Sequence, residues 1–189
     1  MPKYILIAGV NGAGKSTLFH LLDNLQDMPR INTDEIVREF GSWRNPSDVM
    51  KAGKIAVKKI QQLFEEGCSF NQETTLCGKS IINNIKKAKH LGCQIEVHYV
   101  GVDSIDIAKS RVRERVKNGG HNIPDKDIEK RYLESFFNLK CIMPDCNTIF
   151  FYDNTQSFNC FAVYQSNAGI TIYPDVPSWF QMVTDYQQL

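Results

Sequence analysis

Two kinds of hydrophobic pattern alternate along this chain. Short apolar runs bounded by glycine or polar residues predict strands at residues 3–8, 30–32, 69–74, 94–102 and 148–152. Between these runs, apolar residues recur every three or four positions and predict helices, one starting at residue 15 and the others at residues 34–40, 46–67, 80–91, 104–118 and 124–139. Strands that alternate with helices favour an α/β domain with a mainly parallel sheet, although the pattern does not give the order of the strands.

The last part of the chain has a different pattern. Residues 160–173 are rich in β-forming residues and predict a small hairpin or edge strands. The sequence contains no internal repeat, low-complexity tract or linker that would divide it. We therefore expect a single domain over residues 1–189, in which residues 155–189 form a β-rich tail whose role the pattern does not give.

Composition and charge narrow the class of protein. Hydrophobic residues make up 42% and charged residues 23% of the 189 residues, as in ordinary globular domains. A net charge of +1, from 22 basic and 21 acidic residues, argues against a protein that binds nucleic acid mainly through its phosphates. The longest apolar run, residues 4–10, is far shorter than the roughly 20 residues that span a bilayer.

The cysteines and the amino terminus indicate the compartment. Six cysteines without a CxxC pair favour reduced thiols over a zinc site or a disulfide framework. The amino terminus lacks the basic region, apolar stretch and cleavage site of a secretory signal. We therefore expect a cytoplasmic protein whose partners include neither a membrane nor nucleic acid.

A phosphate-binding motif follows the first predicted strand. Residues 9–16 read Gly-Val-Asn-Gly-Ala-Gly-Lys-Ser and match the P-loop pattern. Its glycines let backbone N–H groups point at phosphate oxygens, Lys15 would reach the β- and γ-phosphates, and the Ser16 hydroxyl would bind Mg²⁺. Because the motif lies between a predicted strand and a predicted helix, it predicts a nucleoside triphosphate site. The residues expected to hold the nucleotide are Gly9, Val10, Asn11, Gly12, Ala13, Gly14, Lys15, Ser16 and Thr17.

The rest of the sequence narrows the nucleotide chemistry. It contains neither the Asn-Lys-x-Asp motif with which GTPases read guanine nor the Leu-Ser-Gly-Gly-Gln segment of transporter ATPases. A compact phosphotransferase remains. Such an enzyme needs a base, a carboxylate for metal or substrate, and arginines for the transferring phosphoryl group.

Two carboxylates occupy suitable positions. Asp34 comes just after the second predicted strand, and Glu73 lies at the end of the third. Because the carboxyl ends of parallel strands gather on the side of the sheet where the P-loop lies, both could reach the nucleotide. Position alone leaves open that Asp34 and its neighbour Glu35 only favour a helix N-terminus, and that Glu73 is an exposed strand-end acid.

Basic side chains gather on the later helices. Arg111 and Arg115 lie along one edge of the apolar stripe of helix 104–118, where guanidinium groups could clamp a phosphate, although a solvated charged face is the alternative. Arg131 has a similar place on the following helix. His121 follows a double glycine and could contact the substrate or be an ordinary loop histidine. The glycines also favour a mobile lid formed by this helix and the loop after it.

Several motifs occur in an order that resembles zeta-toxin-like P-loop kinases. They are the P-loop, Ile31-Asn-Thr-Asp-Glu-Ile36, Glu73-Thr-Thr-Leu76, Arg111 through Arg115, Gly119-Gly-His-Asn-Ile-Pro124, Arg131-Tyr132 and Tyr152-Asp-Asn154. The resemblance spans about residues 3–155 and is nearest to the short, stand-alone bacterial branch of the family. It implies an adenylate-kinase-like, three-layer α/β sandwich.

The resemblance also implies an activity. The best-described zeta toxins use ATP and Mg²⁺ to phosphorylate UDP-N-acetylglucosamine, or related UDP-amino sugars, at the sugar 3′-hydroxyl. By resemblance, Asp34 accepts the proton of that hydroxyl, and Glu73 and Thr75 position the substrate. Two of the three arginines named above would clamp the phosphoryl group. An antitoxin-like protein partner is also compatible with the family.

Two alternatives remain open. The acceptor could be another hydroxyl compound, such as an antibiotic, a nucleoside or a polynucleotide end, although the near-neutral charge disfavours the last. The protein could also bind ATP without any acceptor and present a nucleotide-dependent surface to a partner. The combination of Asp34, Glu73 and the arginines favours the enzyme, because a switch needs no acceptor base.

Overall fold

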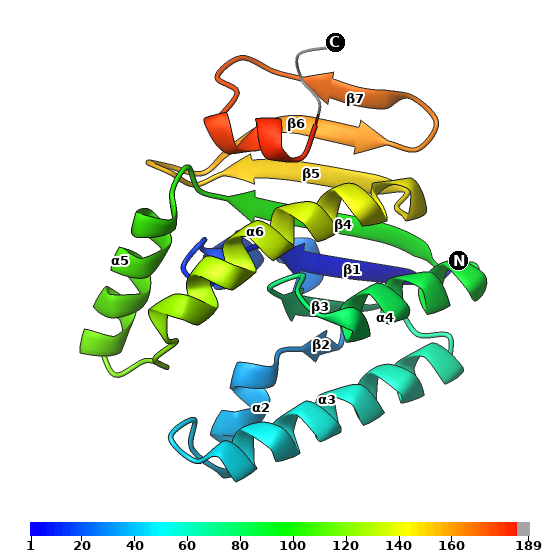
Figure 1. Ribbon diagram of the computed structural model, residues 1–189. Helices are drawn as coiled ribbons and strands as arrows, with labels where there is room; N and C mark the ends of the chain where they lie inside the picture. Colours follow the sequence, from blue (N-terminus) through cyan, green and yellow to red (C-terminus); the bar gives the residue numbers. More distant parts are fainter. Residues whose placement is uncertain (185–189) are drawn as a thin grey trace.

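The computed structural model describes residues 1–184, whose strands form one sheet flanked by helices (Figure 1). The strands are β1 (Lys3–Ala8), β2 (Arg30–Ile31), β3 (Phe70–Thr74), β4 (Gln94–Gly101), β5 (Thr148–Asp153), β6 (Asn159–Gln165) and β7 (Gly169–Ile172). The α-helices are α1 (Lys15–Leu21), α2 (Thr33–Phe40), α3 (Pro46–Glu65), α4 (Lys79–His90), α5 (Ile105–Lys117) and α6 (Asp125–Ile142). Three short 3₁₀ helices are η1 (Asp23–Leu25), η2 (Met143–Asp145) and η3 (Ser178–Met182).

The sheet has the strand order β2-β3-β1-β4-β5-β6-β7. Strands β1 to β5 are parallel, whereas β6 and β7 are antiparallel to their neighbours. The predicted mainly parallel α/β fold is therefore confirmed, and so is the predicted hairpin near the carboxyl end. The last residues of the predicted tail, 185–189, lie outside the described residues.

Several predicted boundaries were wrong by a few residues. The strand expected at 30–32 ends at Ile31, because the side chain of Asn32 accepts a hydrogen bond from the Asp34 amide and caps α2. The first helix, for which the pattern predicted only a start, ends at Leu21 and is followed by η1. The last helix continues to Ile142, since its apolar stripe extends through the buried Leu139 and Ile142.

Apolar residues pack on both faces of the sheet. In β1, Tyr4, Leu6 and Ala8 belong to the larger core, which includes residues of α3, α4 and α6, while Ile5 and Ile7 pack with α1 and η1 on the other face. Figure 1 shows α4 and α6 crossing the near face, with α1 behind it. Burial on both sides explains why β1 is an unbroken apolar run.

The P-loop is held tightly between neighbouring elements. A Cβ atom on Gly9 would lie 2.2 Å from the carbonyl oxygen of Val100 in β4, and one on Gly12 would lie 2.5 Å from the carbonyl oxygen of Ala108 in α5. Both glycines also have a positive φ, which side chains disfavour. The turn therefore needs glycine for its conformation as well as for the close approach of β4 and α5.

The carboxyl-terminal segment completes the larger core. Trp179 and Phe180 of η3 are fully buried and contact Phe161 of β6. The Trp179 indole Nε1–H donates a hydrogen bond of 2.9 Å to Asp153 at the end of β5. The aromatic residues near the end of the chain thus pack against the last strands. Among residues 1–184, no helix combines the length and the hydrophobicity needed to cross a membrane.

Candidate active site

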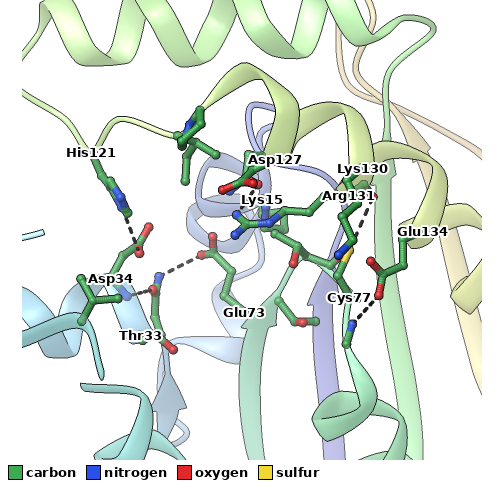
Figure 2. A pocket seen from close by; sticks show the side chains of 18 of the residues that line it. Lys15, Thr33, Asp34, Glu73, Cys77, His121, Asp127, Lys130, Arg131 and Glu134 are labelled. Atoms are coloured by element: carbon green, nitrogen blue, oxygen red, sulfur yellow. Dashed lines mark hydrogen bonds and ion pairs between the residues drawn. The ribbon is translucent and has the colours of Figure 1, made fainter. Parts of the chain in front are cut away.

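A cavity of about 710 Å³ lies where the carboxyl ends of the parallel strands meet the P-loop (Figure 2). The start of α2, the loop after β3, the loop after α5 and one face of α6 form its walls. Of the residues singled out from the sequence, it brings together Asn11, Lys15, Asp34, Glu73, Thr75, Arg115, His121 and Arg131. Side chains predicted from five separate segments therefore share one space.

Lys15 lies where the P-loop borders the cavity. It is 8% exposed, and its ammonium group donates a hydrogen bond of 3.1 Å to the Val10 carbonyl of the P-loop. Burial lowers the pKa of Lys15, whereas the carboxylates of Glu73 and Asp34 act to raise it. Because the buried ammonium group has lost much of its hydration, a bound phosphate would stabilise its positive charge. Lys15 is therefore well placed to bind an anion.

Glu73 is the centre of a polar cluster beside the P-loop. Its carboxylate accepts hydrogen bonds from the Ser16 hydroxyl at 3.1 and 3.2 Å, from Arg30 at 2.8 Å and from the Asn32 amide at 3.0 Å. Strand β3 pairs with both β1 and β2, so it carries Glu73 between the P-loop and the end of β2. The carboxylate therefore lies against the hydroxyl that is expected to bind Mg²⁺.

Arg30 did not stand out in the sequence, and Asn32 did so only as part of the motif at residues 31–36. Arg30 begins β2 and Asn32 follows this strand, and their link to Glu73 depends on β2 being the neighbour of β3. Because the hydrophobic pattern does not give the strand order, no signal in the sequence pointed to this cluster.

Asp34 and Glu35 point to different surroundings. Asp34 lines the cavity, and its Oδ1 lies 3.7 Å from Nδ1 of His121. Glu35 lies outside the cavity lining and forms an ion pair of 3.2 Å with Arg30. The side-chain directions follow from the 100° turn per helical residue, so only one of these two adjacent carboxylates faces the cavity.

Two of the three candidate arginines reach the cavity. Arg115 lines it and donates a hydrogen bond of 2.9 Å to the His121 carbonyl, and Arg131 lines it and donates one of 3.0 Å to the Asn11 side chain. Arg111 does not line it, because its guanidinium group donates to the carbonyls of Asn154 and Thr155 at 2.7 and 3.1 Å. The clamp candidates that remain at the cavity are therefore Arg115 and Arg131.

Helix α6 contributes further charged residues that the sequence analysis missed. Asp127, Lys130 and Glu134 line the cavity together with Arg131 (Figure 2). Their spacing of three, four and seven residues places all of them on one face of a helix, so the helical period was a usable signal. The Glu134 carboxylate also accepts a hydrogen bond of 2.7 Å from the Gly78 amide, which joins α6 to the start of α4.

The residues present fit a magnesium–nucleotide complex. Within residues 1–184, no group of three or more His, Cys, Asp and Glu side chains is arranged to hold a metal ion. A magnesium ion at the P-loop would take Ser16 and the nucleotide phosphates as ligands, as the P-loop pattern predicts. The buried Lys15 ammonium and the tightly packed P-loop glycines suit the same complex.

A family model and a curated relative place the chain among known proteins. The model described as Zeta toxin matches residues 1–175. The chain belongs to the zeta toxin family. An uncharacterized protein of Haemophilus influenzae is 32% identical over 130 residues, which cover 69% of this chain and 92% of that protein.

Solved structures share the fold of this zeta-toxin-family protein. The PezAT chromosomal toxin–antitoxin system of Streptococcus pneumoniae matches with a TM-score of 0.65 and 17% identity, over 100% of this chain and 85% of that chain. The AvrRxo1-ORF1:-ORF2 complex with ATP matches with a TM-score of 0.71 and 13% identity, over 91% of this chain and 60% of that chain. The protein thus spans about three fifths of that AvrRxo1 chain. Family membership and the P-loop fold together support nucleotide binding and a phosphotransferase.

Proposed function

We propose that the protein is an ATP- and Mg²⁺-dependent kinase that phosphorylates a hydroxyl group of a UDP-sugar such as UDP-N-acetylglucosamine. One observation carries the kinase assignment: a single cavity contains the P-loop lysine, the Asp34 carboxylate and two arginines. These are the phosphate anchor, the base and the clamp that phosphoryl transfer requires. The UDP-sugar is proposed from membership of the zeta toxin family.

The phosphate end of the reaction is assigned to the P-loop and the arginines. The backbone amides of residues 9–16 and the Lys15 ammonium would hold the β- and γ-phosphates, and Ser16 would hold Mg²⁺ with Glu73 beside it. Bound Mg²⁺ offsets charge on the phosphate oxygens. Arg115 and Arg131 would bind the oxygens of the group in transfer, because guanidinium binds phosphate through two N–H groups.

The acceptor end is assigned to Asp34. The acceptor oxygen would form a bond to the γ-phosphorus as the bond from that phosphorus to the β–γ bridging oxygen breaks, and ADP would leave. The hydroxyl proton would pass to the Asp34 carboxylate. Thr75 and Glu73, at the end of β3, would contact the acceptor and help to place its hydroxyl near this carboxylate.

A protein partner and a compartment complete the proposal. The PezAT structure is that of a toxin–antitoxin system, and we propose an antitoxin-like partner for this chain as well. We also propose a cytoplasmic location, which suits the use of ATP and the six free cysteines.

The test is direct phosphoryl transfer. The protein is incubated with ATP, Mg²⁺ and either UDP-N-acetylglucosamine or a metabolite extract, and mass spectrometry searches for a compound that gains one phosphate. A phosphorylated UDP-sugar is expected. Phosphorylation of another hydroxyl compound would support the kinase assignment but show that the acceptor is not a UDP-sugar. ATP binding without any phosphorylated product would favour a nucleotide-dependent binding protein.

A further inference from the structure

His121 occupies an unusual place between the lid loop and the proposed base. From the sequence it was a candidate substrate contact, but its imidazole ring points toward Asp34 (Figure 2). We infer that His121 is a positioning residue, which is docked on Trp43 and holds the Asp34 carboxylate toward the cavity through its Nδ1–H. This inference rests on the proposed function, because it gives the base of that reaction its orientation.

The first observation is an orphaned nitrogen. Nδ1 of His121 is shielded from solvent and has no hydrogen-bond partner, a costly state for a buried polar atom. Asp34 Oδ1 lies 3.7 Å away, slightly beyond hydrogen-bond length. A shift of less than an ångström by the loop that carries His121 would make the bond. The geometry thus supplies a donor whose nearby acceptor is the proposed base.

The second observation is that Asp34 lacks any other restraint. Its backbone amide is fixed by the Asn32 side chain, but its carboxylate makes no hydrogen bond to any of residues 1–184 and is 48% exposed. A carboxylate that rotates freely would face an acceptor hydroxyl only part of the time. A base must lie within hydrogen-bond reach of the proton that it takes. A contact that orients the Asp34 carboxylate is therefore needed, and the His121 ring lies close enough to provide it.

The third observation is the support behind the imidazole. The ring stacks on the indole of Trp43 with centroids 5.6 Å apart and an angle of 18° between planes. Trp43 belongs to the loop between α2 and α3, and the guanidinium carbon of Arg38 lies 5.0 Å from its ring centre. Arg115 binds the His121 carbonyl at 2.9 Å. Residues from both sides of the cavity thus contact His121.

The lowered pKa of His121 favours a neutral imidazole, which can still donate one hydrogen bond. Burial, the largest effect, lowers the pKa of His121, and the positive charges of Arg115 and Arg131 act in the same direction. The Asp34 carboxylate acts to raise it. A neutral imidazole with its proton on Nδ1 would hold the carboxylate without placing a full positive charge beside it, so Asp34 would keep its strength as a base.

The kinetic test separates this role from simple packing. His121→Phe keeps a flat ring against Trp43 but removes the donor, whereas His121→Asn removes the ring but places an N–H near the position of Nδ1. With ATP and UDP-N-acetylglucosamine as substrates, we expect His121→Phe to lower kcat by about tenfold or more with little change in the KM for ATP. His121→Asn should recover most of that loss. If His121→Phe is the more active variant, the ring only packs the loop and the inference is wrong.

A second measurement needs no acceptor. The pKa of His121 is followed by NMR of the imidazole ring in the wild-type protein and in Asp34→Asn. The pKa should fall in the variant, because the carboxylate that raises it has been removed. An unchanged pKa would overturn the inference. If the pKa falls but the wild-type protein phosphorylates no compound, the contact stands and the proposed function fails.

Discussion

At the scale of single residues, the candidates divide into those that line the cavity and those that do not. Lys15 and Asp34 both line this cavity, and the adjacent Glu35 is turned toward Arg30. Arg111 is turned toward the loop after β5. The roles of Lys15 and Asp34 can therefore be tested with neighbours or surface residues of the same type as controls.

Lys15→Ala should separate nucleotide binding from folding. The change removes the cation expected at the β- and γ-phosphates, so ATP binding should weaken and phosphoryl transfer should fall by orders of magnitude. The unfolding midpoint should change little, because the side chain is a buried charge rather than part of the apolar core. Isothermal titration with ATP and thermal unfolding measure both effects. Lys58→Ala, on the exposed side of α3, is the control, and full transfer activity in Lys15→Ala would refute the P-loop assignment.

Asp34→Asn should separate catalysis from binding. The amide keeps the size of the carboxylate but cannot take a proton, so ATP affinity should survive while transfer falls by roughly 100-fold or more. The matched control is Glu35→Gln, which changes the neighbouring carboxylate outside the cavity lining. Steady-state kinetics on both variants show which of the two carboxylates acts as the base. Greater damage from Glu35→Gln would contradict the assignment of the base.

At the scale of elements, α5 contacts the P-loop near its start and ends at a glycine-containing loop. Its residue Ala108 touches the P-loop at Gly12, so the first turns cannot move without displacing the nucleotide site. The end of α5 continues into Gly119, which has a φ of 83°, and into the loop that carries His121. Movement of the predicted lid should therefore be confined to the end of the helix and the loop after it.

Hydrogen exchange can locate this movement. With a non-hydrolysable ATP analogue and UDP-N-acetylglucosamine bound together, amide exchange in residues 111–124 should slow markedly, because closure buries the loop over the ligands. Exchange in residues 105–110 should change less, since the P-loop already holds them. Identical exchange with and without ligands would argue against a lid.

At the scale of the whole molecule, the carboxyl-terminal segment is part of the core. Trp179→Ala would remove a fully buried indole and its hydrogen bond to Asp153, and such changes cost about 3–5 kcal/mol of unfolding free energy. Met182→Ala, in the same 3₁₀ helix but 43% exposed, should cost no more than about 0.5 kcal/mol. Denaturant unfolding measures both variants. An equal loss of unfolding free energy in the two variants would show that η3 does not support the sheet.

The sequence alone determined what is encoded in contiguous residues. The P-loop is a run of eight positions whose glycines and lysine act through their own backbone and side chains, and the strands and helices followed from local periodicity. The position of Asp34 just after β2 was likewise readable, because strand ends gather at one edge of a parallel sheet.

Only the tertiary structure decided which distant segments meet. Glu73 reaches Ser16 and Arg30 because β3 lies between β1 and β2, and Arg131 reaches Asn11 across 120 positions of the sequence. Trp43 and His121 stack from two loops that no periodic pattern connects. Helical spacing placed Arg111 and Arg115 on one side of α5, yet a difference of four residues, about 6 Å along the axis, directs one to the loop after β5 and the other to the cavity. Periodicity gives the face on which a side chain lies, but the packing of neighbouring elements sets what that side chain can touch.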